Sequence, residues 1–146
     1  LKAVEPYLKG ESMFLANYSD GVTDLPLPDY LEHFQARGKI GCFLTVRPPY
    51  SYHVVSFEED VVRRITPISQ SGIWINGGFM VFRQEIFSYL RAGEELVEAP
   101  FERLIREEQL LTYKYDGYWA CMDTFKDKEQ LESLYTRGEA PWEVWK

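Results

Sequence analysis

The sequence predicts an α/β fold whose strands and helices form layers within one domain, residues 1–146. Apolar runs of strand length alternate with segments of helical periodicity, which is typical of this class. The chain is 45% hydrophobic and 16% aromatic, and no repeat, linker or low-complexity tract interrupts it. One compact domain of this size buries roughly two-thirds of the surface that its unfolded chain exposes.

The first half predicts two helices and two strands. Residues 1–8 have the spacing of a short amphipathic helix. Residues 13–18 are an apolar run, which predicts a strand covered on both faces, as in a parallel sheet. Residues 28–38 predict a helix that begins at Pro28 and ends at Gly38, and residues 40–46 predict the second strand.

The second half begins with a predicted hairpin, residues 52–57 and 61–65, around the acidic turn Glu58-Glu59-Asp60. Residues 74–82 predict a strand that Gly77 and Gly78 interrupt. The remaining elements are predicted as short helices over 86–90 and 100–106, a strand over 110–115 and a helix over 123–137.

The charge of the chain excludes some classes of partner. Sixteen Lys and Arg against twenty-three Asp and Glu give a net charge of −7. Without a dense basic run, we expect no nucleic-acid partner, and without a run of ~20 apolar residues we expect no membrane span. An acidic protein can still bind a phosphorylated small molecule, because a metal ion or backbone donors offset the repulsion.

Two cysteines, Cys42 and Cys121, are predicted as buried free thiols in a reducing compartment. We expect no zinc site, because His33 and His53 lie near no cysteine pair. The start has no signal peptide, which favours the cytoplasm. The chain does not begin with Met, so we expect it to be part of a longer one.

Four segments carry more specific information, and they are residues 17–24 (Asn-Tyr-Ser-Asp-Gly-Val-Thr-Asp), 74–79 (Trp-Ile-Asn-Gly-Gly-Phe), 117–128 and 140–145. In order and spacing they resemble the later part of the glucose-1-phosphate cytidylyltransferases, a family of sugar-1-phosphate nucleotidyltransferases. The resemblance implies the C-terminal, sugar-binding portion of a nucleotidyltransferase (Rossmann-like) fold, with the N-terminal nucleotide-binding portion absent. It also implies a mixed, mostly parallel sheet flanked by helices.

The family's reaction transfers a nucleotidyl group from CTP to a sugar 1-phosphate, here glucose 1-phosphate, giving a CDP-sugar and pyrophosphate. Negative charge gathers on the phosphoryl oxygens, so positioning and a divalent cation carry much of the catalysis. Mg²⁺ prefers one or two carboxylates, with water and phosphate oxygens completing its octahedron. The resemblance assigns these carboxylates to Asp20 and Asp123, at strand ends that we expect to meet at the carboxyl edge of the sheet.

The resemblance further assigns substrate binding to Tyr18, Ser19, Asn76, Gly77, Glu98 and Trp119. Structural alternatives stay open for several of these residues. Asp20 before glycine suits a turn, Asp123 suits a helix N-cap, and Asn76 suits a β-bulge bonded to backbone. Glu98 is also consistent with a charge exposed to solvent, and Tyr18 and Trp119 are also consistent with a hydrophobic core or an interface.

Two features depart from the family. The glycine-rich loop with Pro-Lys-Pro, which holds the triphosphate, is not in the sequence, so we expect the isolated chain to be inactive. The Glu-Lys-Pro lysine that binds the sugar phosphate is also missing, because residues 64–70 read Arg-Ile-Thr-Pro-Ile-Ser-Gln. Arg63 or Arg64 is a candidate substitute, although an arginine fork is not equivalent to a lysine point charge.

These departures leave two alternatives to the cytidylyltransferase. One is a non-catalytic, nucleotidyltransferase-like domain for sugar-phosphate binding or assembly, and the other is an enzyme for another sugar, such as mannose or a heptose. The family often forms oligomers. The aromatic ending with Trp142 and Trp145 is predicted either as a homo-oligomer interface or as a cap on the chain's own core.

Overall fold

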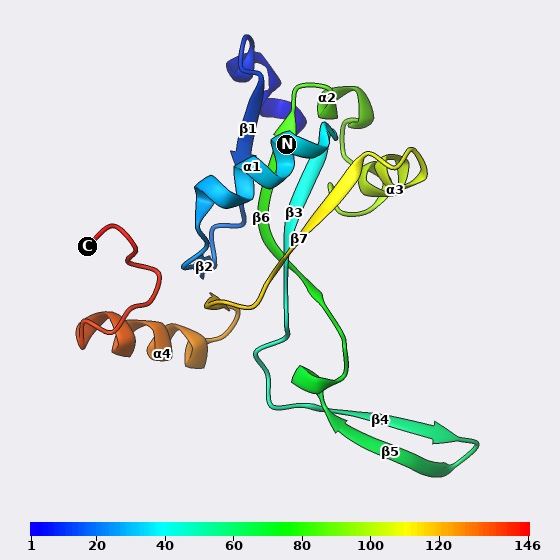
Figure 1. Cartoon of the computed structure of the whole chain (residues 1–146), viewed down its shortest axis with the longest axis vertical. Helices are drawn as coiled ribbons and strands as arrows, with labels where there is room; N and C mark the ends of the chain where they lie inside the picture. The colour runs from blue at the N-terminus through cyan, green and yellow to red at the C-terminus, as the bar shows by residue number, and fades with distance from the viewer.

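The computed structural model describes residues 1–146 and contains a four-stranded mixed sheet (Figure 1). Its strand order is β1-β6-β3-β7. β6 runs antiparallel to both β1 and β3, and β3 runs parallel to β7. The α/β class and the mixed sheet are confirmed, but parallel pairs do not predominate within this chain. The strands are β1 (Met13–Ala16), β3 (Gly41–Val46), β6 (Ile75–Arg83) and β7 (Leu110–Tyr115).

Strand β1 differs from its prediction, which was a strand covered on both faces. It lies at the edge of the sheet and pairs only with β6. Phe14 is buried, whereas Leu15 is half exposed. An apolar run of strand length cannot distinguish a central parallel strand from an antiparallel edge strand, because both satisfy it.

Helices cover both faces of the sheet. Successive residues of a strand point to opposite faces, and Val81 packs in the cluster with Phe34 of α1 (Leu27–Arg37), whereas Phe82 packs in the cluster with Phe101 of α3 (Ala99–Arg106). The short α2 (Ile86–Tyr89) joins the second cluster. The predicted α1 is confirmed, and it ends at Gly38, whose φ of 61° is the left-handed conformation that glycine tolerates.

The predicted short helix at the start of the chain is present as a 3₁₀-helix, η1 (Lys2–Leu8). Pro6 lies inside it and has no N–H to donate to an α-helical hydrogen bond. None of its residues is buried. A segment without a buried apolar face gains little from packing as an α-helix.

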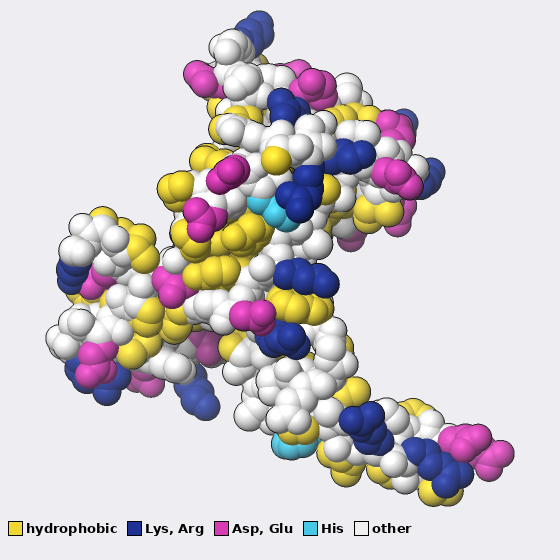
Figure 2. Space-filling view, in the orientation of Figure 1, with side chains coloured by type: hydrophobic (Ala, Val, Ile, Leu, Met, Phe, Trp, Pro, Cys, Tyr) yellow, Lys and Arg dark blue, Asp and Glu magenta, His cyan; other side chains and the backbone are white.

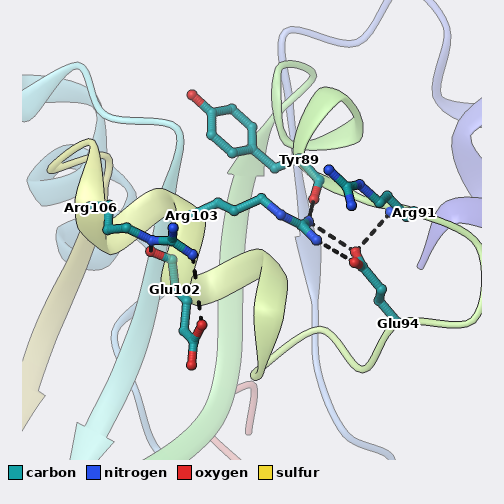
Figure 3. A network of polar contacts seen from close by, with 6 residues as sticks. All are labelled: Tyr89, Arg91, Glu94, Glu102, Arg103 and Arg106. Atoms are coloured by element: carbon teal, nitrogen blue, oxygen red, sulfur yellow. Dashed lines mark hydrogen bonds and ion pairs between the residues drawn. The ribbon is translucent and has the colours of Figure 1, made fainter.

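The loop between α2 and α3 is held by an ionic network (Figure 3). The Arg103 guanidinium donates to both carboxylate oxygens of Glu94 and to the Tyr89 carbonyl. The Arg91 N–H donates to the same carboxylate at 3.0 Å. The hydrogen bond from Arg103 lowers the pKa of Glu94. These contacts fix the path of the loop that carries Glu98.

The other elements lie outside the main sheet. The predicted hairpin is confirmed as β4 (His53–Glu58) and β5 (Val61–Pro67), which project from the body (Figure 1), and the 3₁₀ turn η2 (Ile68–Gln70) follows. A second ribbon, which the sequence did not predict, pairs β2 (Gly21–Thr23) with β8 (Trp119–Cys121). The last helix is α4 (Phe125–Thr136). No helix is long and apolar enough to cross a bilayer.

The two tryptophans near the end of the chain differ in their burial. Trp142 is partly buried, and its ring centroid lies 5.7 Å from that of Tyr118, so it covers the chain's own structure. Trp145 is largely exposed. The homo-oligomer interface at this end stays a prediction.

Tyr30 ties α1 to two strands, and its loss is expected to destabilise the fold. The ring is fully buried, and the hydroxyl lies 3.0 Å from the carbonyl oxygens of both Cys42 and Phe79. Burial raises the pKa of Tyr30, which keeps it a donor at all ordinary pH values. Tyr30→Phe should lower the free energy of unfolding by about 1–3 kcal/mol, because the carbonyls lose a buried partner.

Urea denaturation measures this loss. Tyr7→Phe is the matched control, since Tyr7 is 87% exposed and should change stability by less than about 0.5 kcal/mol. Equal stability of Tyr30→Phe and the wild type would show that these hydrogen bonds do not hold α1.

Candidate functional site

The pairing of β2 with β8 brings the two predicted metal ligands together. Gly21 lies opposite Cys121 in this antiparallel ribbon. The Met122 N–H donates to the Asp20 carbonyl oxygen at 2.9 Å. Asp20 therefore lies at the end of the ribbon where β8 finishes, close to Asp123.

This geometry corrects the expectation that both aspartates follow strands at the carboxyl edge of the main sheet. Asp123 does follow β8, but Asp20 precedes β2 and is separated from β1 by a turn. Antiparallel pairing places the start of one strand beside the end of the other. The aspartates consequently meet at one end of the small ribbon.

A cavity of about 230 Å³ contains both aspartates. Four residues of the predicted substrate-binding set also line it, and they come from three distant parts of the chain: Tyr18, Asn76, Gly77 and Trp119. Four other lining residues were not predicted from the sequence: Gly21, Tyr50, Ile75 and Cys121.

Asn76 makes the backbone contact of its structural alternative and also lines the cavity. Its side chain is exposed. Its Oδ1 accepts a hydrogen bond from the Gly78 N–H at 2.9 Å, and the register with β3 shifts at this point. The Nδ2 group donates to no protein atom. The backbone therefore satisfies only one side of the amide, and its two donor hydrogens have no protein acceptor.

The adjacent glycines make room for aromatic side chains. The Trp119 Nε1–H donates to the Gly77 carbonyl at 2.8 Å, and a Cβ on Gly77 would lie 3.3 Å from that nitrogen. A Cβ on Gly78, whose φ is 82°, would lie 2.7 Å from Cδ2 of Tyr18. With its N–H occupied, Trp119 offers a ligand only its ring.

Asp123 is held by two donors that the sequence did not identify. The Cys121 thiol donates to Oδ2 at 3.0 Å, and the Tyr50 hydroxyl lies 3.5 Å from the same oxygen. Burial raises the pKa of Cys121, as does its hydrogen bond to Asp123. The contact with Cys121 raises the pKa of Tyr50. Both groups therefore keep their protons at neutral pH and remain donors.

Helix capping does not account for Asp123. The N-cap of α4 is Thr124, whose hydroxyl accepts from the Asp127 N–H, while the Asp127 carboxylate accepts from the Thr124 N–H. This capping box satisfies the start of the helix. The carboxylate of Asp123 is consequently available to the cavity.

Ser19 and Glu98 are not among the residues that line the cavity. Ser19 is exposed in the turn before Asp20, and Glu98 is exposed immediately before α3. Burial raises the pKa of Tyr18, and the charges of Glu95 and Asp20 raise it further. The charge of Glu95, and not that of Glu98, contributes to this shift in the pKa of Tyr18. The sugar contact of Glu98 stays a prediction that this geometry does not support.

The donor set limits what metal the site can hold. No group of three His, Cys, Asp or Glu side chains is arranged to bind a metal ion. Two carboxylates suit a hard cation such as Mg²⁺, which takes its remaining ligands from water and phosphate oxygens. A closed structural zinc site needs four protein ligands, so the residues fit Mg²⁺ and not zinc.

Relatives of known activity match nearly the whole chain. It is 31% identical to the glucose-1-phosphate cytidylyltransferase of Salmonella typhi over 147 residues, which are 99% of this chain and 57% of that protein. A Bacillus subtilis protein assigned the same activity is 25% identical over 138 residues, 93% of this chain and 54% of that protein. The resemblance to the glucose-1-phosphate cytidylyltransferases is confirmed. The chain spans somewhat more than half the length of these cytidylyltransferases, which is consistent with a C-terminal portion.

Solved structures support the same fold. A Bacillus anthracis protein assigned as a glucose-1-phosphate thymidylyltransferase, in complex with sucrose, superposes with a TM-score of 0.64. The match covers 91% of this chain and 58% of that chain at 13% identity. The chain thus has the fold of the sugar-1-phosphate nucleotidyltransferases, to which the cytidylyltransferases belong. No model of a known protein family matches it.

The contact between Gly78 and Tyr18 predicts a stability difference between two glycine substitutions. Gly78→Ala and Gly72→Ala both place a side chain at positive φ, 82° and 78°, which costs about 1–2 kcal/mol. Nothing lies within 4 Å of a Cβ on Gly72. Gly78→Ala should therefore lose about 1–3 kcal/mol more, because it also displaces the Tyr18 ring.

Thermal or urea denaturation of the two variants measures the difference. Equal losses would mean that Tyr18 moves aside freely and that Gly78 does not position it.

Proposed function

We propose that this chain forms the sugar-phosphate side of a sugar-1-phosphate nucleotidyltransferase site, with glucose 1-phosphate as acceptor and CTP as donor. One observation carries the proposal: Asp20 and Asp123, far apart in the sequence, line one cavity with Asn76 and Trp119. The activity named for the Salmonella typhi relative supports the choice of substrates. The nucleotide contacts belong to a glycine-rich loop that these 146 residues do not contain.

Each side chain has a proposed role that follows from its contacts. Asp20 and Asp123 would hold Mg²⁺, which when bound neutralises charge on the phosphoryl oxygens during attack on the α-phosphorus. The Cys121 and Tyr50 donors fix the Asp123 carboxylate. Asn76 donates through Nδ2 to a sugar oxygen, and the Trp119 ring packs against the sugar.

The size of the cavity agrees with a site that holds the metal ion and the sugar phosphate. Its volume of about 230 Å³ is below the roughly 300–1,000 Å³ of pockets for drug-sized ligands. It therefore suits one sugar ring and not a complete nucleotide sugar. The two unpaired thiols, Cys42 and Cys121, support a reducing compartment such as the cytoplasm.

The two departures from the family leave a second candidate, a non-catalytic sugar-phosphate-binding domain, and either candidate needs another cation in place of the missing lysine. Arg63 and Arg64 lie on the projecting hairpin, and neither lines the cavity. They do not replace the lysine. An adjoining cavity, which shares Tyr50 and Cys121 with the first, contains Lys126, and we propose this lysine as the counter-charge for the sugar phosphate.

Removing either metal carboxylate tests the enzymatic proposal. In the complete protein, Asp20→Asn and Asp123→Asn should each lower kcat by roughly 10²-fold or more, because each removes charge that acts at the transition state. Pyrophosphate release from CTP and glucose 1-phosphate with Mg²⁺ is the measurement. Asp29→Asn, an exposed aspartate in the first turn of α1, is the control and should leave kcat unchanged.

The two candidate functions give different results in this assay. Binding of glucose 1-phosphate that requires Mg²⁺, without any pyrophosphate release by the wild type, would support the binding domain. Full activity of both aspartate variants would refute the metal assignment.

Asn76 and Asn17 form a matched pair for testing the sugar contact. Each side-chain amide bonds to nearby backbone, Asn76 to the Gly78 N–H and Asn17 to the Tyr18 carbonyl, but only Asn76 lines the cavity. Asn76→Ala should lower kcat/KM for glucose 1-phosphate about 2- to 12-fold, which corresponds to one hydrogen bond of about 0.5–1.5 kcal/mol. Asn17→Ala should not.

The melting temperature separates this role from a structural one. Asn76 is exposed but accepts from the Gly78 N–H, so Asn76→Ala should lower the melting temperature only slightly, and Asn17→Ala should leave it unchanged. A lowered melting temperature with normal kinetics would falsify the sugar contact.

A further inference from the structure

The two carboxylate oxygens of Asp123 have different surroundings. The Cys121 thiol donates to Oδ2 at 3.0 Å, and the Tyr50 hydroxyl lies 3.5 Å from the same oxygen. The hydroxyl also lies 3.6 Å from the Cys121 sulfur, so the two donors contact each other. No group of the protein donates to Oδ1. Both donors therefore lie on the Oδ2 side of the carboxylate, and Oδ1 is left for a ligand.

The two donors reach Asp123 from separate parts of the fold. Cys121 is the last residue of β8, and its partner in the ribbon is Gly21. Tyr50 lies in the segment between β3 and β4, directly after two prolines that restrict the backbone. Two elements therefore fix which oxygen of Asp123 is engaged.

Asp20 is not constrained in this way. It is partly buried in the turn before β2, and its backbone carbonyl accepts from the Met122 N–H. Its carboxylate takes part in no hydrogen bond or ion pair, although it lines the same cavity. The two carboxylates thus differ, because Asp20 has both oxygens free and Asp123 has only one.

The cavity supplies no further acidic ligand. Asp20 and Asp123 are the only carboxylates among the residues that line it. The hairpin β4–β5 projects away from the body of the molecule (Figures 1 and 2), and none of its residues lines the cavity. A cation at the two aspartates therefore takes most of its ligands from water and from phosphate oxygens.

This donor set distinguishes between the two common hard cations. Mg²⁺ takes about six oxygen ligands in a near-ideal octahedron and usually keeps several waters, so one oxygen from each carboxylate is enough. Ca²⁺ takes roughly 6–8 ligands and often binds both oxygens of one carboxylate. An ionised carboxylate has about four lone-pair sites, and those of Oδ2 face the thiol and the hydroxyl. A cation that binds both oxygens of Asp123 would have to displace these donors.

We propose that Cys121 and Tyr50 make the site prefer Mg²⁺ over Ca²⁺, because they leave Asp123 a single oxygen for the cation. The inference rests on the proposed role of Asp20 and Asp123 as metal ligands, and it adds which ion they select. The thiol and hydroxyl hydrogens carry partial positive charge, so they also repel a cation that approaches Oδ2. A cation bound only through Oδ1 is farther from these hydrogens.

Displacement of Mn²⁺ measures this selectivity without relying on turnover. Mn²⁺ bound to the complete protein is quantified by electron paramagnetic resonance, and Mg²⁺ or Ca²⁺ is then added as a competitor. The ratio of the two dissociation constants is the informative quantity, because the loss of a donor also changes the affinity of Asp123 for every cation. Tyr50→Phe combined with Cys121→Ala should lower the preference for Mg²⁺ at least about fivefold, since two hydrogen bonds no longer oppose binding through Oδ2. Each single change should lower it about twofold.

Two conservative variants serve as controls. Cys121→Ser keeps a donor at the same position, and its ratio should stay close to that of the wild type. Tyr52→Phe removes the hydroxyl of the neighbouring exposed tyrosine, which makes no hydrogen bond to Asp123, and should also leave the ratio unchanged. Circular dichroism checks that each variant folds.

The outcomes separate this inference from the metal assignment. If Asp20→Asn and Asp123→Asn leave Mn²⁺ binding unchanged, the metal assignment itself fails, and the inference fails with it. If both variants weaken Mn²⁺ binding but the donor variants keep the wild-type ratio, the metal site stands and the role of Cys121 and Tyr50 in selectivity is overturned.

Discussion

The pairing of β2 with β8 is the contact on which the candidate site depends. Three residues per strand are too few for a stable ribbon by themselves, so side chains anchor it. The Asp24 carboxylate accepts from the Tyr115 hydroxyl at 2.5 Å and from the Tyr118 N–H at 2.8 Å, and the Thr23 hydroxyl donates to the Tyr118 carbonyl at 2.7 Å. The space before β8 is limited as well, because a Cβ on Gly117 would collide with the Tyr115 hydroxyl. Asp24 thus anchors the ribbon at whose end Asp20 lies.

Elements with strong local signals were predictable from the sequence, and their pairing was not. The helix that ends at Gly38 has a glycine cap, and the hairpin around Glu58-Glu59-Asp60 has an acidic turn. Each of these signals lies within a few residues of sequence. Three-residue strands have no periodicity to detect, so β2 and β8 were missed.

The start of α4 likewise depends on a pairing that the sequence does not show. Asp123 and Thr124 can both cap a helix, and the reciprocal bond with Asp127 selects Thr124.

The resemblance to the family identified the residues of the candidate site, and the structure adds contacts of these residues that the sequence did not show. Sequence placed Asn76, Gly77 and Trp119 at the site but could not show that the Trp119 N–H is already occupied by Gly77. The roles of Tyr50 and Cys121 follow from contacts between separate segments. Cys121 stands two residues before Asp123, a spacing that places both on the same side of an extended strand, and this signal was available. The sequence held no such signal for Tyr50, because its approach to Asp123 depends on the path that the chain takes after the end of β3.

The position of Tyr50 connects the site to the projecting hairpin β4–β5. The segment from Arg47 to Tyr52 links the end of β3 to the start of β4, and Pro48 and Pro49 restrict its backbone. The ring of Tyr50 lies 5.5 Å from that of Tyr52 at the base of the hairpin, while its hydroxyl contacts Asp123. Any contact that fixes the hairpin therefore also limits the positions of one donor to the Asp123 carboxylate. A restricted path of this segment orders Tyr50 before a ligand arrives, and preorganisation of this kind lowers the entropy that binding must overcome.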